Sequence, residues 1–316
     1  MTSHVVALCG GVGGAKLAHG LAMALPAESL TVIVNTADDF EHLGLHISPD
    51  LDSVMYALAG LSDPDRGWGQ RAESWNFMEM LQQLGGPGWF RLGDRDLAVH
   101  IERSRRLSEG VRLSEVTAQL CSRLGITVRV LPMSDEPVRT RVLTDEGWLE
   151  FQEYFVHRHC EPPVQAFAFA GAEAAHAVPE AARALARSDL TAIVICPSNP
   201  FVSVEPILAV SDIRLALERA RAPVIAVTPI VGGKALKGPA AKMLGELGLE
   251  VTPEAVARRY TGIIDAFVVD AADPLPAPIR GITFFSAATI MRSEPDRLRL
   301  AQAVLRSAAE LVAREP

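Results

Sequence analysis

Cysteine is scarce in this sequence, and long apolar runs are missing from it. The four cysteines lie far apart and form no CxxC pair. Cys9 and Cys196 end apolar runs, so we expect buried, reduced thiols there. No apolar run is long enough to cross a bilayer, and no charged-then-apolar leader follows Met1. The sequence therefore predicts a cytoplasmic protein that has no membrane partner.

Positive charge is also in short supply. The 30 lysines and arginines are outnumbered by 38 aspartates and glutamates, which gives a net charge of −8. This balance argues against a nucleic-acid partner, because duplex binding normally needs a basic face. It leaves room for a nucleotide, since a local loop or a metal can bind phosphate on an acidic protein. The eight histidines form no ligand pattern and no GxSxG elbow is present, so nucleophilic catalysis is disfavoured.

What the sequence does contain, at its start, is a strand–glycine–helix pattern. An apolar run over residues 4–9 leads into GGVGGAK and then into apolar residues at helical spacing. Glycines let backbone N–H groups approach a phosphate, and a following helix N-terminus favours negative charge. We therefore predict that Gly11, Gly13 and Gly14 bind phosphate and that Lys16 reaches it. The stretch satisfies neither the P-loop nor the dinucleotide pattern, and a tight turn without a ligand is the alternative.

Strands and helices alternate along most of the chain, and 49% of its 316 residues are hydrophobic, enough for a sizeable core. Residues 62–125 show helical spacing without a clear strand, and residues 139–155 contain a β-hairpin pattern. We expect an α/β fold with a Rossmann-like, doubly wound, mostly parallel sheet. Residues 1–61 and 126–316 are predicted to form this core, and residues 62–125 a helical insertion subdomain.

Acidic residues gather after the second apolar run, over residues 30–34. Asp38, Asp39, Asp50 and Asp52 follow that strand and precede or begin the next helical pattern. Two carboxylates, phosphate oxygens and waters together complete an octahedral Mg²⁺ shell. A magnesium–phosphate site shared with the glycine stretch is therefore predicted. For Asp39 alone, a helix cap or a solvated carboxylate is the preferred interpretation.

Two further stretches follow later strands. In residues 196–203, two prolines are expected to fix a loop and point Ser198 and Asn199 outward, toward a base or ring edge. A rigid strand-to-helix connection is the alternative. Residues 228–239 hold a second glycine stretch with two lysines, which suits either an anion or a mobile surface loop. Because carboxyl ends of parallel strands share one edge, all four groups are predicted to meet at one rim of the sheet.

Taken together, these stretches resemble the 2-phospho-L-lactate transferase family (CofD/FbiA) of coenzyme F-420 biosynthesis. The matching segments are GGVGGAK, VNTADD, SPDLDS, DPDRGWG, WFRLGDRDLA, SNPFVS and TPIVGGKALKGP. The resemblance implies transfer of phospholactate or phosphoenolpyruvate from a guanosine-diphosphate-activated donor, with release of GMP and assistance from Mg²⁺. The implied acceptor is the ribityl hydroxyl of 7,8-didemethyl-8-hydroxy-5-deazariboflavin (Fo). A homodimer with a Rossmann-like domain and a helical subdomain is also implied.

The resemblance further implies roles for individual residues. Asp38 resembles a metal ligand, with Asp50 or Asp52 as the second. Asp50 and Arg91 are similar to positions that contact the deazaflavin. We take Asp50, beside the metal ligand, as the leading candidate for orienting or deprotonating the acceptor hydroxyl. The residues implied to lie near the donor nucleotide are Gly11, Gly13, Gly14, Ser198 and Asn199.

Two alternatives remain at this stage. A related family of nucleotide-sugar-binding morphogenesis and gluconeogenesis factors shares the early glycine stretch, but WFRLGDRDLA and the helical insertion weigh against it. An NAD(P)-dependent oxidoreductase would need a different glycine pattern. No residue in the sequence distinguishes the lactate, enolpyruvate and glycerate forms of the phospho-acid.

Overall fold

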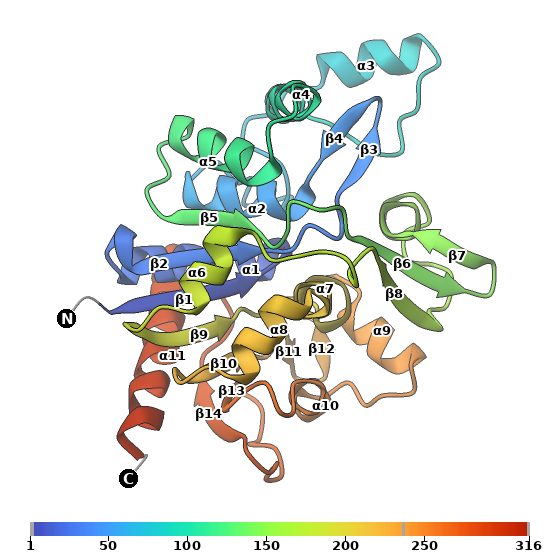
Figure 1. Cartoon of the computed structure of the whole chain (residues 1–316). Coiled ribbons are helices and arrows are strands. Elements are labelled where there is room, and N and C mark those ends of the chain that lie inside the picture. The colour runs from blue at the N-terminus through green and yellow to red at the C-terminus, as the bar shows by residue number, and fades with distance from the viewer. Residues whose placement is uncertain (1–2, 236–237, 315–316) are drawn as a thin grey trace.

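A seven-stranded parallel sheet forms the centre of the computed structural model, which describes residues 3–235 and 238–314 (Figure 1). Its strands are β1 (His4–Cys9), β2 (Leu30–Val34), β5 (Arg129–Pro132), β9 (Leu190–Ile195), β10 (Val224–Val227), β13 (Ala266–Asp270) and β14 (Thr283–Ala287). They lie in the order β14-β13-β10-β9-β1-β2-β5, and every neighbouring pair is parallel. The direction of winding reverses between β1 and β9, so the predicted doubly wound fold is confirmed.

Successive side chains of a strand point to opposite sides of the sheet. Both faces of this sheet are apolar, and helices cover both. In β1, Val6 and Leu8 enter one core, and Val5, Ala7 and Cys9 enter the other. Helices packed on the Val5 side are α1 (Gly11–Ala24), α2 (Pro49–Leu58), α5 (Leu113–Arg123) and α11 (Glu294–Arg314). Helices packed on the Val6 side are α6 (Pro179–Leu185), α7 (Glu205–Ala209), α8 (Ser211–Glu218), α9 (Ala240–Glu246) and α10 (Pro253–Arg259).

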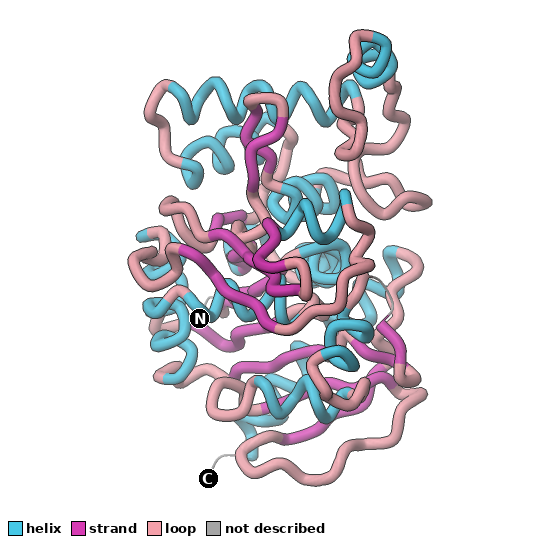
Figure 2. Tube along the Cα trace, turned by 90° about the vertical axis from the view of Figure 1, so that its right-hand side faces the viewer, coloured by secondary structure: helices cyan, strands magenta, loops and turns pink. Residues whose placement is uncertain are grey.

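The segment predicted as a helical insertion contains α3 (Asn76–Gln83), α4 (Asp94–Ser108) and α5. A hairpin that the sequence did not predict, β3 (Phe40–His42) with β4 (Leu45–Ile47), rises from the sheet toward α4 (Figures 1 and 2). Ile47 of this hairpin shares a small core with Met78 and Leu92 of the insertion. The boundary at residues 62–125 stays a prediction, since α5 packs into the main core while the hairpin joins the insertion.

A second, antiparallel sheet contains β6 (Arg139–Thr144), β7 (Gly147–Glu150) and β8 (Ala166–Ala170). The β6–β7 pair is the predicted hairpin, although β7 ends early because the chain turns into a helical segment at Phe151. In the second glycine stretch, β11 (Ile230–Val231) pairs with β12 (Lys234–Ala235), and residues 236–237 lie outside the described ones. Across the described ranges, no helix combines the length and apolarity needed to span a bilayer.

Candidate active site

The carboxyl ends of β1 and β9 lie side by side at the point where the winding reverses, which is where open α/β sheets bind ligands. The Ser198 hydroxyl, in the loop after β9, donates to the Gly10 carbonyl at 2.9 Å and accepts from the Gly10 N–H at 3.2 Å. Glycines permit this approach: a Cβ on Gly13 would lie 2.3 Å from the Pro197 oxygen, and one on Gly14 would lie 2.5 Å from Ser198 Oγ. The predicted outward orientation of Ser198 is therefore wrong, because its hydroxyl is buried and joins the two loops.

The glycine stretch forms the first turn of α1 rather than a separate loop. Gly10 is extended and Gly11, with φ of +61°, already begins the helix. The Gly11 N–H donates to Oδ1 of Asp50 at 2.7 Å. First-turn amides lack intrahelical partners and favour anions, so this helix end already attracts negative charge. The structure thus brings Gly11 and Asp50 together, as the sequence predicted.

Asp50 lies in the first turn of α2 and is held from a second side by Asn35. The Asn35 side-chain N–H donates to Oδ2 of Asp50 at 2.9 Å and to the Val202 carbonyl at 3.2 Å. Its Oδ1 accepts from the Ala37 N–H at 3.0 Å, which fixes the orientation of the amide. Asn35 was not among the predicted site residues, although its position directly after β2 is a signal for one.

Two more buried carboxylates, Asp38 and Asp39, lie in the segment that follows β2. Asp38 Oδ1 lies 3.3 Å from the Thr140 hydroxyl of β6. Asp39 Oδ2 accepts from the Ser48 hydroxyl at 2.8 Å and lies 3.1 Å from His46 Nε2, whereas its Oδ1 has no hydrogen-bond partner among the described residues. Asp39 is only 2% exposed, so its interpretation as a solvated carboxylate is wrong.

The ionised forms of Asp38 and Asp50 are electrostatically unfavourable in this environment. Burial, followed by the charge of Asp50, raises the pKa of Asp38 well above its usual range, although hydrogen bonds oppose the change. Burial raises the pKa of Asp50 to about 6 against the opposing hydrogen bonds from Asn35 and Gly11. No lysine or arginine in the described ranges forms an ion pair with Asp38 or Asp50.

Buried carboxylates without a cationic partner are costly, and a divalent ion removes that cost. The buried Oδ1 of Asp39, which has no hydrogen-bond partner among the described residues, is a further oxygen that an ion could use. The residues present therefore fit a hard divalent cation such as Mg²⁺. Asp38 and Asp50 are close enough for the charge of Asp50 to raise the pKa of Asp38.

Asp52 lies in the same turn of α2 but belongs to a different group. Both of its oxygens accept hydrogen bonds from the Arg103 guanidinium of α4, at 3.1 Å for the Nη1–Oδ2 pair. His100 lies beside Arg103, and Asp96 accepts from the Tyr56 hydroxyl. Arg103 is 1% exposed, so this network joins the insertion to α2 in the interior. The structure does not bring Asp52 together with Asp38.

Lys16 and Asn199 also use their side chains within the protein. The Lys16 ammonium donates to the Met291 carbonyl, in the segment that follows β14, at 3.0 Å. The Asn199 oxygen accepts from the Phe201 N–H at 3.0 Å, and its amide nitrogen lies 3.3 Å from the Met243 sulfur. The predicted contacts of both residues with a nucleotide stay predictions.

Aromatic side chains line the insertion. The Arg91 guanidinium lies 4.2 Å from the centre of the Trp75 ring. Within the described residues, no hydrogen bond or ion pair joins Arg91 to Asp50. Nearby in the sequence, Trp89 packs edge-on against His42 of β3 at 5.1 Å and stacks on His157 at 5.3 Å. The contacts of Trp89 connect the insertion, the β3–β4 hairpin and the segment after β7.

Comparisons with known proteins identify a family and relatives of this chain. A family model described as 2-phospho-L-lactate transferase CofD matches residues 5–303. A phosphoenolpyruvate transferase of Kitasatospora aureofaciens is 45% identical over 277 residues, covering 85% of this chain and 86% of that protein. One of Mycobacterium avium is 41% identical over 322 residues, covering 92% and 94%. A UPF0052 family protein of Bacillus halodurans has a similar crystal structure, with TM-score 0.62, 16% identity and coverage of 96% and 99%, which shows the fold alone.

Proposed function

The chain belongs to the 2-phospho-L-lactate transferase (CofD) family, so it is a phospho-acid-transferring enzyme of coenzyme F-420 biosynthesis, and from this we propose its substrates. The donor is a guanosine diphosphate that carries phosphoenolpyruvate, and the acceptor is the ribityl hydroxyl of the deazaflavin Fo. The enolpyruvate form is favoured because the relatives at 41–45% identity are named for it. Transferase relatives also favour an enzyme over the nucleotide-sugar-binding alternative.

The buried carboxylates without cations are the observation that carries this proposal. Asp38 would hold a Mg²⁺ ion, since magnesium sites in phosphoryl-transfer enzymes commonly use one or two carboxylates beside the substrate phosphates. When bound, the ion neutralises charge on the phosphates. Asp52 is not expected to contact the metal, because both of its oxygens accept hydrogen bonds from Arg103. The first-turn amides of α1 face the donor phosphates beside Asp50.

Asp50 orients the acceptor hydroxyl and receives its proton. The hydroxyl oxygen attacks the phosphorus that bears the enolpyruvate, and the bond from this phosphorus to the oxygen of GMP breaks. The products are a phosphodiester of the deazaflavin and free GMP, so no covalent intermediate on the protein is needed. A carboxylate whose pKa is about 6 is mostly ionised at neutral pH and remains basic enough to accept a proton.

The acceptor ring is proposed to stack on the aromatic surface of the insertion, with Arg91 at its edge. Cation–π contact with Trp75 already orders the Arg91 side chain. The homodimer and the cytoplasmic location stay predictions from the sequence.

A coupled assay tests the function directly. Purified guanylyltransferase supplies the activated donor from phosphoenolpyruvate, phospholactate or phosphoglycerate, and mass spectrometry identifies the deazaflavin product. We expect the enolpyruvate phosphodiester and stoichiometric GMP. If no acid gives a product while calorimetry shows tight binding of UDP-N-acetylglucosamine, the binding-protein alternative is correct instead.

A further inference from the structure

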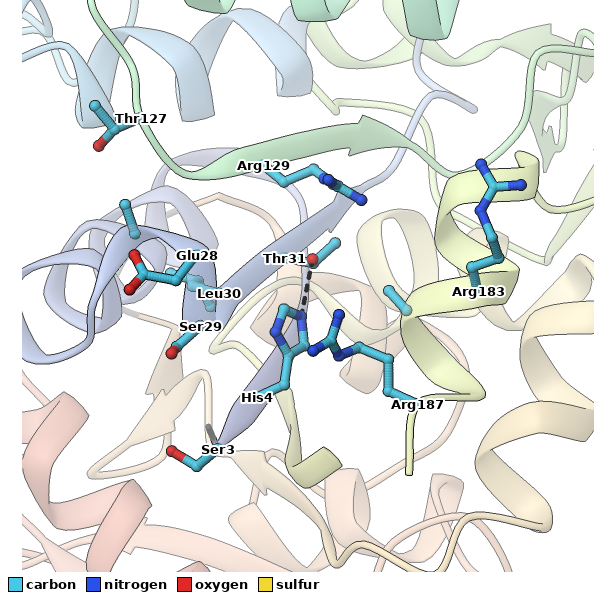
Figure 3. A pocket seen from close by; sticks show the side chains of 12 residues that line it. Ser3, His4, Glu28, Ser29, Leu30, Thr31, Thr127, Arg129, Arg183 and Arg187 are labelled. Atoms are coloured by element: carbon cyan, nitrogen blue, oxygen red, sulfur yellow. Dashed lines mark hydrogen bonds between the residues drawn. The ribbon is translucent and has the colours of Figure 1, made fainter. Parts of the chain in front are cut away.

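The amino-terminal end of the sheet, away from Asp38 and Asp50, contains a hollow of about 670 Å³ (Figure 3). The first residues of β1, β2 and β5 line it, together with the turn before β2 and the last turn of α6. In parallel strands of about six residues, this edge lies roughly 20 Å from the carboxyl ends. Its volume falls within the roughly 300–1,000 Å³ that is usual for small-molecule pockets.

Arginine is the most frequent charged residue in the lining of this hollow, on a chain whose net charge is negative. Arg129, Arg183 and Arg187 line it, and Glu28 is its only carboxylate among the described residues. Arg183 forms an ion pair with Glu180, and Arg187 forms one with Asp189 through two hydrogen bonds. Such exposed pairs contribute little to stability, so an anion that enters the hollow can replace these carboxylates. Arg129 of β5 forms no ion pair within the described ranges.

A buried histidine forms the floor between two of these arginines. His4 is 4% exposed, and its Nε2 lies 3.0 Å from the Thr31 hydroxyl of β2. Its Nδ1 faces the Glu28 backbone without a hydrogen bond of normal geometry. Figure 3 shows the Arg187 guanidinium beside the His4 ring and the Arg129 side chain extending above Thr31. Burial is the main cause of the lowered pKa of His4; the charges of Arg187 and Arg129 act in the same direction, and the charge of Asp189 opposes them.

We propose that this arginine pocket binds a small phosphorylated organic anion, with the phosphate between Arg129 and Arg187 and the organic part against the apolar atoms of the floor. A guanidinium group can bind two phosphate oxygens at once, and a doubly charged phosphate suits two arginines in one hollow better than a single carboxylate does. A small molecule is favoured over nucleic acid because the positive charge is confined to one hollow. The proposal does not rest on the identity of the transferase substrates.

Calorimetry with inorganic pyrophosphate, on the full chain in EDTA, tests this pocket without the metal that the active site uses. Arg129→Gln is expected to weaken binding about tenfold or more, because charge-assisted hydrogen bonds are lost. Arg187→Gln, also an exposed position, is expected to act in the same direction. Arg105→Gln, an exposed arginine on α4, is the matched control and should leave binding unchanged.

Hydrogen exchange locates the bound anion independently of these variants. Pyrophosphate should protect amides of residues 27–31, at the floor of the pocket. Protection confined to residues 10–14 would place the anion in the active site and overturn the proposal. Equal affinity for wild type and both pocket variants, or equal weakening by Arg105→Gln, would also overturn it. Loss of transferase activity is a separate result, because activity depends on the opposite end of the sheet.

Discussion

Asp50→Asn is expected to stabilise the metal-free protein while abolishing transfer. Burial raises the pKa of Asp50 from 3.8 to about 6. A carboxyl group whose folded pKa is raised contributes stability that is complete below about pH 4 and is lost as the pH rises through about 6. The difference between these two pKa values corresponds to a cost of about 3 kcal/mol in the free energy of unfolding at pH 7.5. The neutral amide avoids this cost but gives up the hydrogen bond from Asn35, worth about 1 kcal/mol.

The net expectation is a gain of about 2 kcal/mol in the free energy of unfolding, measured by urea denaturation at pH 7.5 in EDTA. Asp270→Asn is the matched control. Asp270 is equally buried, and although burial raises its pKa, hydrogen bonds from the Ala272 N–H and the Thr289 N–H and hydroxyl outweigh this and lower it. The same substitution should therefore destabilise the protein there.

The pH dependence provides the stricter test. The advantage of Asp50→Asn over wild type should be present at pH 7.5 and should shrink as the pH falls from about 6 to about 4, because wild-type Asp50 becomes protonated. If Asp50→Asn is as destabilised as Asp270→Asn, or if its difference from wild type does not change with pH, Asp50 is not an electrostatically strained carboxylate and the reasoning is refuted.

Two substitutions test the packing around the site. Arg103→Met should lower the free energy of unfolding by about 3–5 kcal/mol, because it leaves the Asp52 charge buried without its partner. Arg105→Met, on the exposed face of α4, should change the free energy of unfolding by under about 0.5 kcal/mol. Equal small effects of the two substitutions would contradict the buried ion pair. Gly14→Ala should cost about 1–3 kcal/mol by thermal denaturation, since the new methyl lies 2.5 Å from a hydroxyl oxygen. Gly245→Ala in α9 has open space and should instead stabilise by about 0.5–1 kcal/mol; a gain at both positions would refute the close contact of α1.

The central strands were predictable because their signal is local. β9 and β10 are short apolar runs buried on both faces, as a parallel sheet covered by helices requires. The β3–β4 hairpin was missed because each of its strands has three residues and its core partners lie in the insertion. β14 was missed for a related reason, since most of its residues are only partly buried. Whether these strands form depends on packing partners that are distant in sequence.

The sequence allowed prediction of those contacts in the site that join loops after neighbouring strands. Gly11 and Asp50 meet because both follow adjacent strands of one sheet. The pairing of Asp52 with Arg103 depends on the packing of α4 on α2, across 51 residues of sequence, and no local pattern indicates it. The helix caps also depend on distant partners. Asp94, at the start of α4, accepts hydrogen bonds from first-turn amides of α3, and Glu73 accepts them from first-turn amides of α4.

Mg²⁺-dependent binding of GDP tests the central claim most directly, because it isolates the carboxylate that is proposed to hold the metal. Calorimetry with and without Mg²⁺ should show that the ion strengthens GDP binding to wild type and to Asp50→Asn. In Asp38→Asn this gain should fall by about tenfold or more, since loss of even an outer metal contact costs about that much. Full Mg²⁺-dependent GDP binding by a folded Asp38→Asn protein would contradict a magnesium–phosphate site at the ends of β1 and β2.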